Sequence, residues 1–232
     1  MGVVKGLSVI GQVWRKNMRL SGLLVLILVV ICGFVRAGDA PVFSQDFEKA
    51  DVDKDAGALE FLVLGDGDFK VKQDGANKVL ELAPTPLETY GILFGPTETE
   101  DVAVRARAFG TSSGRRFPVF AVGVNGVGGY MLRLNPAKKA VEILKGEDVK
   151  GSAPYAWTTG TWSILSLSIR KVKDGAWTVE GKAWEQGKEE PKDALVKFEE
   201  TEKPTPGRCG AWGIPYSASP IRFDDLLVQK LK

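Results

Sequence analysis

The amino-acid sequence predicts an all-β domain, folded as a two-sheet antiparallel sandwich, that follows an N-terminal signal segment. Turn-forming residues recur every eight to fifteen positions after Ala40, and β-rich segments lie between them. No stretch shows the sustained apolar period of 3.6 residues that an amphipathic helix requires. With 232 residues, 44% of them hydrophobic, the chain is long enough to bury the core of one such domain.

The first element is an apolar run of about sixteen residues from Leu20 to Val35, directly after Arg19. Val35 and Ala37 suit the −3 and −1 positions of a cleavage site after Ala37, so residues 1–37 are predicted to be a secretory signal. The run is shorter than the roughly 20 residues of a membrane-spanning helix, although an uncleaved N-terminal anchor is the alternative.

Cleavage at this site would leave one β-sandwich domain, residues 38–232, without a stable membrane span. Met18 is a candidate for the true start, because a compact signal begins there; an extended n-region from Met1 is the alternative. We expect the protein to be exported to the periplasm, the cell surface or the medium.

The mature chain is predicted to form a series of hairpins. Residues 185–206 are acidic and rich in Lys and Pro, which indicates a long exposed loop around a short edge strand near 194–198. The predicted turns are Asp74 to Asn77, Asn125-Gly126, Asn135-Pro136 and Asp174-Gly175.

Alternation within the strands separates an apolar face from a polar one. In the segment 102–108, Val and Ala occupy every second position, and Arg105 and Arg107 lie between them. In the segment 163–170, Ser163, Leu165, Leu167 and Ile169 face one way, and Ile164, Ser166, Ser168 and Arg170 face the other. The sequence therefore predicts an outer face that carries arginine and serine.

Composition excludes several kinds of chemistry. The chain contains no histidine, which excludes Ser-His-Asp and Cys-His catalysis and His-ligated zinc or haem. Its cysteines are Cys32, inside the predicted signal, and Cys209, which we expect to be buried. The five basic residues of segment 1–37 account for the positive net charge, so the rest has a small excess of acid and no nucleic-acid partner is predicted.

Several segments resemble the concanavalin A-like lectin/glucanase superfamily of laminin-G-like sandwiches. They also resemble, more narrowly, the secreted bacterial 3-keto-disaccharide hydrolase-type domains. The matching segments cover nearly all of residues 42–230: "FSQDFE", "VKQDGANKVLEL", "DVAVRARA", "FPVFAVGV", "YMLRLNPAKKAVEILK", "GTWSILSLSIRKV" and "GRCGAWGIPYSASPIRFDDLLVQ". The resemblance implies a jelly-roll sandwich. It also implies an exported glycan-binding or surface-interaction module whose partner is a polysaccharide or glycoconjugate; a hydrolase acting on a glycoside or keto-glycoside is the alternative.

We assign no catalytic residues. Laminarinase-like members of the superfamily carry a Glu-x-Asp-x-(x)-Glu strand motif, which places alternate acids on one face, and no β-rich segment here contains it. The acidic clusters at 98–101 and 199–202 fall in predicted turns.

A structural calcium site is predicted near Asp46, Asp224 and Asp225. The resemblance supports it, because jelly-roll carbohydrate-binding modules often hold calcium where the first and last strands meet. The alternative is that Asp224 caps a loop and Asp225 accepts backbone hydrogen bonds. The segment 51–57 has the acid spacing of an EF-hand but lacks its Gly and final Glu, so it is interpreted as a solvated loop, with an oxygen-ligand metal site of another type as the alternative.

The outer face of arginines is the candidate ligand site. If the strand 118–124 lies beside Arg105 and Arg107, its small residues would leave a trough between guanidinium groups suited to an acidic or sulfated polysaccharide. Cross-strand ion pairing with Glu142 and Glu180 is the alternative. The candidate ligand-binding residues are Arg105, Arg107, Arg133, Ser166, Ser168, Arg170 and Trp184, the last as an aromatic platform for a sugar.

Overall fold

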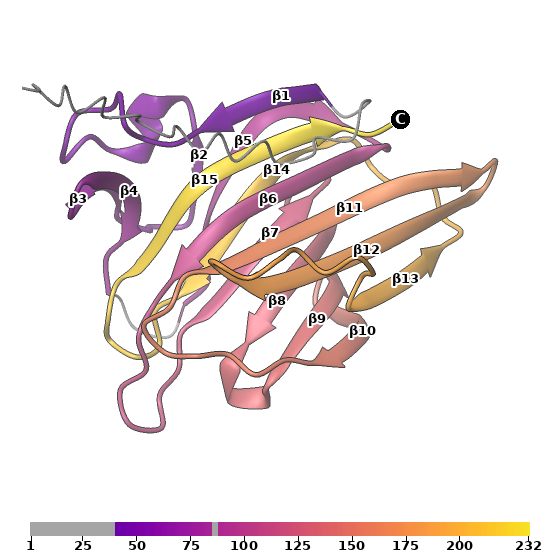
Figure 1. Ribbon diagram of the computed structural model, residues 1–232. Coiled ribbons are helices and arrows are strands. Elements are labelled where there is room, and N and C mark those ends of the chain that lie inside the picture. Colours follow the sequence, from indigo (N-terminus) through magenta and orange to yellow (C-terminus); the bar gives the residue numbers. More distant parts are fainter. Residues whose placement is uncertain (1–39, 85–87) are drawn as a thin grey trace, which may run out of the picture. The chain divides into compact units, whose positions relative to one another are not determined.

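The structure, a computed structural model, describes residues 40–84 and 88–232 (Figure 1). In this part of the chain the regular elements are β-strands and two short 3-10 helices, and every strand pairing is antiparallel. The described residues contain no helix that is long and apolar enough to cross a membrane. The predicted signal, residues 1–37, lies outside the described residues.

The strands form two sheets. The first has eight strands, in the spatial order β13 (Val196–Glu200), β12 (Ala176–Glu185), β11 (Ser163–Lys173), β6 (Val102–Phe109), β15 (Ile221–Lys230), β4 (Asn77–Leu82) and β3 (Phe69–Asp74), with β1 (Ala40–Gln45) paired to β15. Figure 1 shows β6 beside β15, and β1 along the other side of β15.

The second sheet has seven strands. They are β10 (Asp148–Pro154), β9 (Ala140–Lys145), β8 (Tyr130–Asn135), β7 (Val119–Val124), β14 (Gly207–Ile214), β5 (Tyr90–Glu98) and β2 (Leu62–Leu64). The 3-10 helices are η1 (Ala56–Leu59) and η2 (Pro136–Lys138). The two sheets share one core, so the predicted all-β sandwich is confirmed.

The predicted turns join the strands as expected. Asn125 and Gly126, between β7 and β8, both adopt the left-handed backbone conformation, with φ of 66° and 74°. Asn135 ends β8, and its side chain accepts a hydrogen bond from the Lys138 N–H of η2. β13 is the predicted edge strand, displaced by about two residues from the expected range.

The core lies between the sheets, where alternation predicted it. Every second residue of β6 from Val102 to Ala108 and of β11 from Ser163 to Ile169 is buried, and the residues between them face outward. From the opposite sheet, Phe120, Val122 and Val124 of β7 fill the same core. Cys209 is buried as expected, and burial raises the pKa of its thiol to about 12. It is therefore a packing residue and not a nucleophile.

One expectation is wrong. β7 does not lie beside β6, because the connection 110–118 carries the chain from the eight-stranded sheet to the seven-stranded one. The neighbours of β6 are β11 and β15, and the small residues of β7 lie on the other sheet. Alternation defines the two faces of a strand, but it carries no information about which strand pairs with it.

A β-bulge interrupts β15 beside β6. The pairing shifts between Asp224 and Leu227, and Asp225 takes a left-handed φ of 48°. On its other side, β15 pairs with β4 before the bulge and with β1 after it. The extra residue of the bulge brings two consecutive aspartates next to β6 on the outer face.

Candidate functional site

The outer face of the eight-stranded sheet collects most of the predicted ligand-binding residues. Strand register places Arg105 between Ser166 of β11 and Leu227 of β15. It places Arg107 one row further, between Ile164 and Asp224. Ser168 and Arg170 continue the same face of β11 away from this point, where the Arg170 guanidinium donates to the Lys232 carbonyl.

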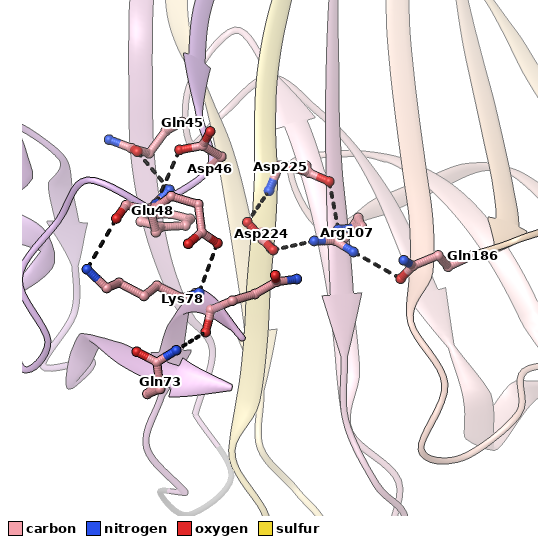
Figure 2. Close-up of polar contacts among 11 residues, drawn as sticks. Gln45, Asp46, Glu48, Gln73, Lys78, Arg107, Gln186, Asp224 and Asp225 are labelled. Carbon is pink, nitrogen blue, oxygen red and sulfur yellow. Dashed lines mark hydrogen bonds and ion pairs between the residues drawn. The ribbon is translucent and has the colours of Figure 1, made fainter. Parts of the chain in front are cut away.

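Arg107 is the centre of a polar network (Figure 2). Its guanidinium donates hydrogen bonds to the Asp224 carboxylate and, over 3.1 Å, to the Gln186 side-chain oxygen. Its Nε lies 2.8 Å from an Asp225 carboxylate oxygen, which is ion-pair distance, although the N–H is not aligned for a hydrogen bond. The guanidinium carbon also lies 4.9 Å from the centre of the Trp162 ring. The Arg107 guanidinium is therefore held in place by two carboxylates, one amide oxygen and an aromatic ring.

Asp224 is the buried member of this network, with an exposed fraction of 2%. Burial raises the pKa of its carboxyl to about 6, against the opposing effects of the Asp225 backbone N–H and of Arg107. The Asp225 N–H donates to an Asp224 oxygen over 2.7 Å. The bulge thus provides the hydrogen bond that holds Asp224 towards Arg107.

The predicted calcium site is not formed by these residues. No group of three or more Asp, Glu, Cys or His side chains that could hold a metal occurs in residues 40–84 and 88–232. Asp224 and Asp225 turn towards Arg107, and Asp46 accepts the Glu48 N–H over 3.2 Å (Figure 2). Arg107 and the Asp225 backbone N–H compensate the Asp224 carboxylate, whereas the Asp225 carboxylate pairs with Arg107 instead of accepting the backbone hydrogen bonds of the alternative interpretation.

A hollow of about 850 Å³ opens on this face of the sheet. Arg105 and Leu227 lie at its floor, Ile164 and Trp184 line one side, and Asp46 and Lys49 line the other. Trp184 faces outward, opposite Ile164, but only 7% of its surface is exposed. Trp184 lines the side of the hollow and is less exposed than alternation suggested.

Arg133 lies apart from the other candidates, on β8 of the seven-stranded sheet. Its Nε and one terminal nitrogen donate to the same Glu142 oxygen, over 2.9 and 2.8 Å. Lys138 donates to the other oxygen over 3.0 Å. Burial acts to raise the pKa of Glu142, but the hydrogen bonds from Lys138 and Arg133 outweigh it, and the pKa is lowered. Arg133 therefore forms the cross-strand ion pair with Glu142 that the alternative interpretation expected.

Trp212 of β14 forms an apolar platform on the outer face of the seven-stranded sheet. It is 5% exposed and packs with Leu93 and Ala121 in a cluster separate from the main core. Its ring lies over Gly91 and Gly123 of the adjacent strands β5 and β7, and over Gly210 of its own strand. A Cβ at these positions would meet ring atoms at 2.4, 2.8 and 2.6 Å respectively. Only glycine leaves the ring room to lie against the sheet.

A second hollow, of about 570 Å³, lies over this platform. Trp212, Leu64, Met131 and Leu144 give it apolar walls, and Arg133 contributes a charged group. Our sequence analysis assigned no role to this face. The glycines in these strands were a usable signal, because glycine weakens a strand interior and often marks a site where another group approaches the backbone closely. Recognising it required knowing that β5, β7 and β14 are neighbours.

Comparison with known proteins identifies the fold. No known protein family and no curated protein matches the chain. A Bacillus subtilis protein of unknown function with a galectin-like fold matches with a TM-score of 0.56 at 10% identity, over 82% of this chain and 96% of that one. The carbohydrate recognition domain of Emp46p matches at 0.53 and 12%, over 83% and 98%. An alginate lyase from Aplysia kurodai matches at 0.50 and 11%, over 82% and 98%.

At these identities the similarity concerns the fold alone. The chain has the two-sheet sandwich of galectin-like and lectin domains, which confirms the predicted concanavalin A-like architecture.

Proposed function

We propose that the chain is an exported, bacterial glycan-binding module that holds its ligand on the outer face of the seven-stranded sheet. One observation carries the proposal: a hollow of about 570 Å³ combines the apolar platform of Trp212 with the charged Arg133. Ligand pockets typically enclose roughly 300–1,000 Å³ and combine mostly apolar walls with a few fixed polar groups.

Sugars fit this combination. A pyranose ring presents an apolar face of C–H groups and a rim of hydroxyls, so it packs on an apolar floor while its edge forms hydrogen bonds. Arg133 uses two N–H donors on Glu142, and the remaining guanidinium N–H groups can donate to hydroxyl oxygens. The Emp46p domain recognises carbohydrate and the Aplysia enzyme acts on alginate with the same fold, which supports a sugar ligand here.

Export rests on the sequence. The apolar run from Leu20 to Val35 and the small residue at Ala37 favour a signal that is removed on secretion, with the sandwich from Gly38 onward as the mature domain. A module that binds polysaccharide would then work in the periplasm, on the cell surface or outside the cell.

A hydrolase on a glycoside or keto-glycoside is the alternative, and the resemblance to 3-keto-disaccharide hydrolase-type domains supports it. Such chemistry needs carboxyl groups that reach the substrate. Asp224 has a raised pKa near 6, as a general acid would, but it is 2% exposed and bound to Arg107. We therefore favour binding without turnover.

A glycan array with the purified exported protein tests this proposal. We expect retention of particular glycans without release of reducing sugar. Arg133→Ala should weaken binding about tenfold or more, since a hydrogen bond to a charged group contributes roughly 1.5–3 kcal/mol. Arg115→Ala is the matched control, because it removes an exposed guanidinium that lines neither hollow. Unchanged binding by Arg133→Ala would contradict this site, and release of reducing sugar would favour the hydrolase.

A further inference from the structure

The hollow on the eight-stranded sheet differs in its chemistry from the hollow over Trp212 on the seven-stranded sheet. Ser44, Gln45, Asp46 and Lys49, from the end of β1 and the segment after it, form one wall. β11 and β12 form the opposite wall, and the middle of β6 forms the floor. With a volume of about 850 Å³ it is the larger of the two hollows, and six of its lining residues carry charge.

Three of these six charges are already compensated. Asp225 lies 2.8 Å from Arg107, and Glu190 lies 2.8 Å from Lys182. Asp224, the other partner of Arg107, is buried beneath the hollow and does not line it. These groups form the frame of the hollow, and their charges are committed to one another.

Arg105, Lys49 and Asp46 remain. Within the two described ranges, no ion pair or side-chain hydrogen bond engages Arg105 or Lys49. Arg105 is exposed, and its cross-strand neighbours, Ser166 and Leu227, are uncharged. Two cations thus face one carboxylate, whose oxygen accepts the Glu48 N–H. The six lining charges sum to zero, and the cation without an ion-pair partner at the floor of the hollow is the Arg105 guanidinium.

From this arrangement we infer that the hollow is a second ligand site, in which Arg105 binds the carboxylate or sulfate group of an acidic glycan. The planar guanidinium offers two parallel N–H donors that match the oxygens of either anion. Lys49 adds a second positive charge on the wall that follows β1, and Asp46 and Gln45 of the same wall can accept hydrogen bonds from sugar hydroxyls. The site lies on the opposite sheet from the Trp212 platform, so it does not rest on the proposed function.

Titration of the full exported protein with three defined probes tests the inference. Oligogalacturonate presents carboxylates, dextran sulfate presents sulfates, and unmodified dextran presents neither. We expect at least one anionic probe to bind, dextran not to compete, and Arg105→Ala to weaken that probe about tenfold or more while the melting temperature is unchanged. The preferred probe identifies the anion. Arg105→Lys should bind more tightly than Arg105→Ala but less tightly than the wild type, because lysine keeps the charge and lacks the paired N–H donors of the guanidinium.

Two controls separate this site from other effects. Arg115→Ala removes the same charge from an exposed loop, so an equal loss of affinity there would reduce the result to non-specific attraction and overturn the inference. Lys173→Ala removes an exposed positive charge at the end of β11, outside both hollows, and should leave the affinity for the anionic probe unchanged. Failure of both anionic probes to bind, or unchanged binding by Arg105→Ala, would also overturn the second site. Neither result would affect glycan binding at the Trp212 platform.

Discussion

The outer faces of the two sheets carry hollows that are built in opposite ways. On the seven-stranded sheet, the position of the Trp212 ring depends on side chains that are missing at Gly91, Gly123 and Gly210. On the eight-stranded sheet, the shape depends on ion pairs, above all those of Arg107 with Asp224 and Asp225. The first arrangement is sensitive to volume, and the second is sensitive to charge and pH. The two faces should therefore respond to different substitutions.

The largest effect is expected from Arg107→Ala. Removing one partner of a buried ion pair strongly destabilises a fold, and we expect a loss of about 3 kcal/mol, at the low end of the range because Asp224 can take up a proton. Arg105→Ala, two positions away and without a partner in the described structure, should change stability by less than about 0.5 kcal/mol. Urea unfolding of both variants measures the contrast. Equal losses would show that the two arginines share one structural role.

The second prediction concerns the free energy of unfolding, which should change with pH by roughly 2–3 kcal/mol because Asp224 takes up a proton. Its folded-state pKa, about 6, lies above the unfolded value of 3.8, so the folded state binds the proton more tightly. This contribution to stability is fully present below pH 4 and is lost as the pH rises through 6. Asp224→Asn lacks it. The free energy of unfolding of the wild type relative to that variant should therefore fall between pH 4 and pH 7, as urea unfolding at several pH values would record. If the difference in unfolding free energy between the wild type and Asp224→Asn does not vary with pH, the raised pKa does not belong to Asp224.

Local features of this fold could be predicted from the sequence. Alternation assigned Arg105, Arg107 and Ser166 to the outer face correctly, because the period of two is a property of each strand alone. The turn residues located the hairpins for the same reason, since Asn125 and Gly126 supply the left-handed backbone wherever the strands lie.

Features that depend on strand pairing could not be predicted. Placing Arg133 on the opposite sheet, or β7 away from β6, requires the order of strands that are distant in sequence. The burial of Trp184 depends in the same way on what packs around it, and alternation reveals only its direction. The Trp212 platform joins glycines from three strands, so no single segment of the sequence contains it.

The third prediction concerns that platform, and its expected effect has the lowest lower bound of the three. In Gly91→Ala, the new methyl group would meet the Trp212 ring at 2.4 Å, and overpacking of this kind costs about 1–3 kcal/mol. If the clash with the ring is the cause, the same substitution in a Trp212→Ala background should cost much less, because the ring is no longer there. A double-mutant cycle by chemical denaturation measures this coupling. Additive costs would mean that Gly91 is required by the strand itself, and the platform would lose its steric explanation. Gly57→Ala is a control, because a Cβ there meets no atom within 4 Å.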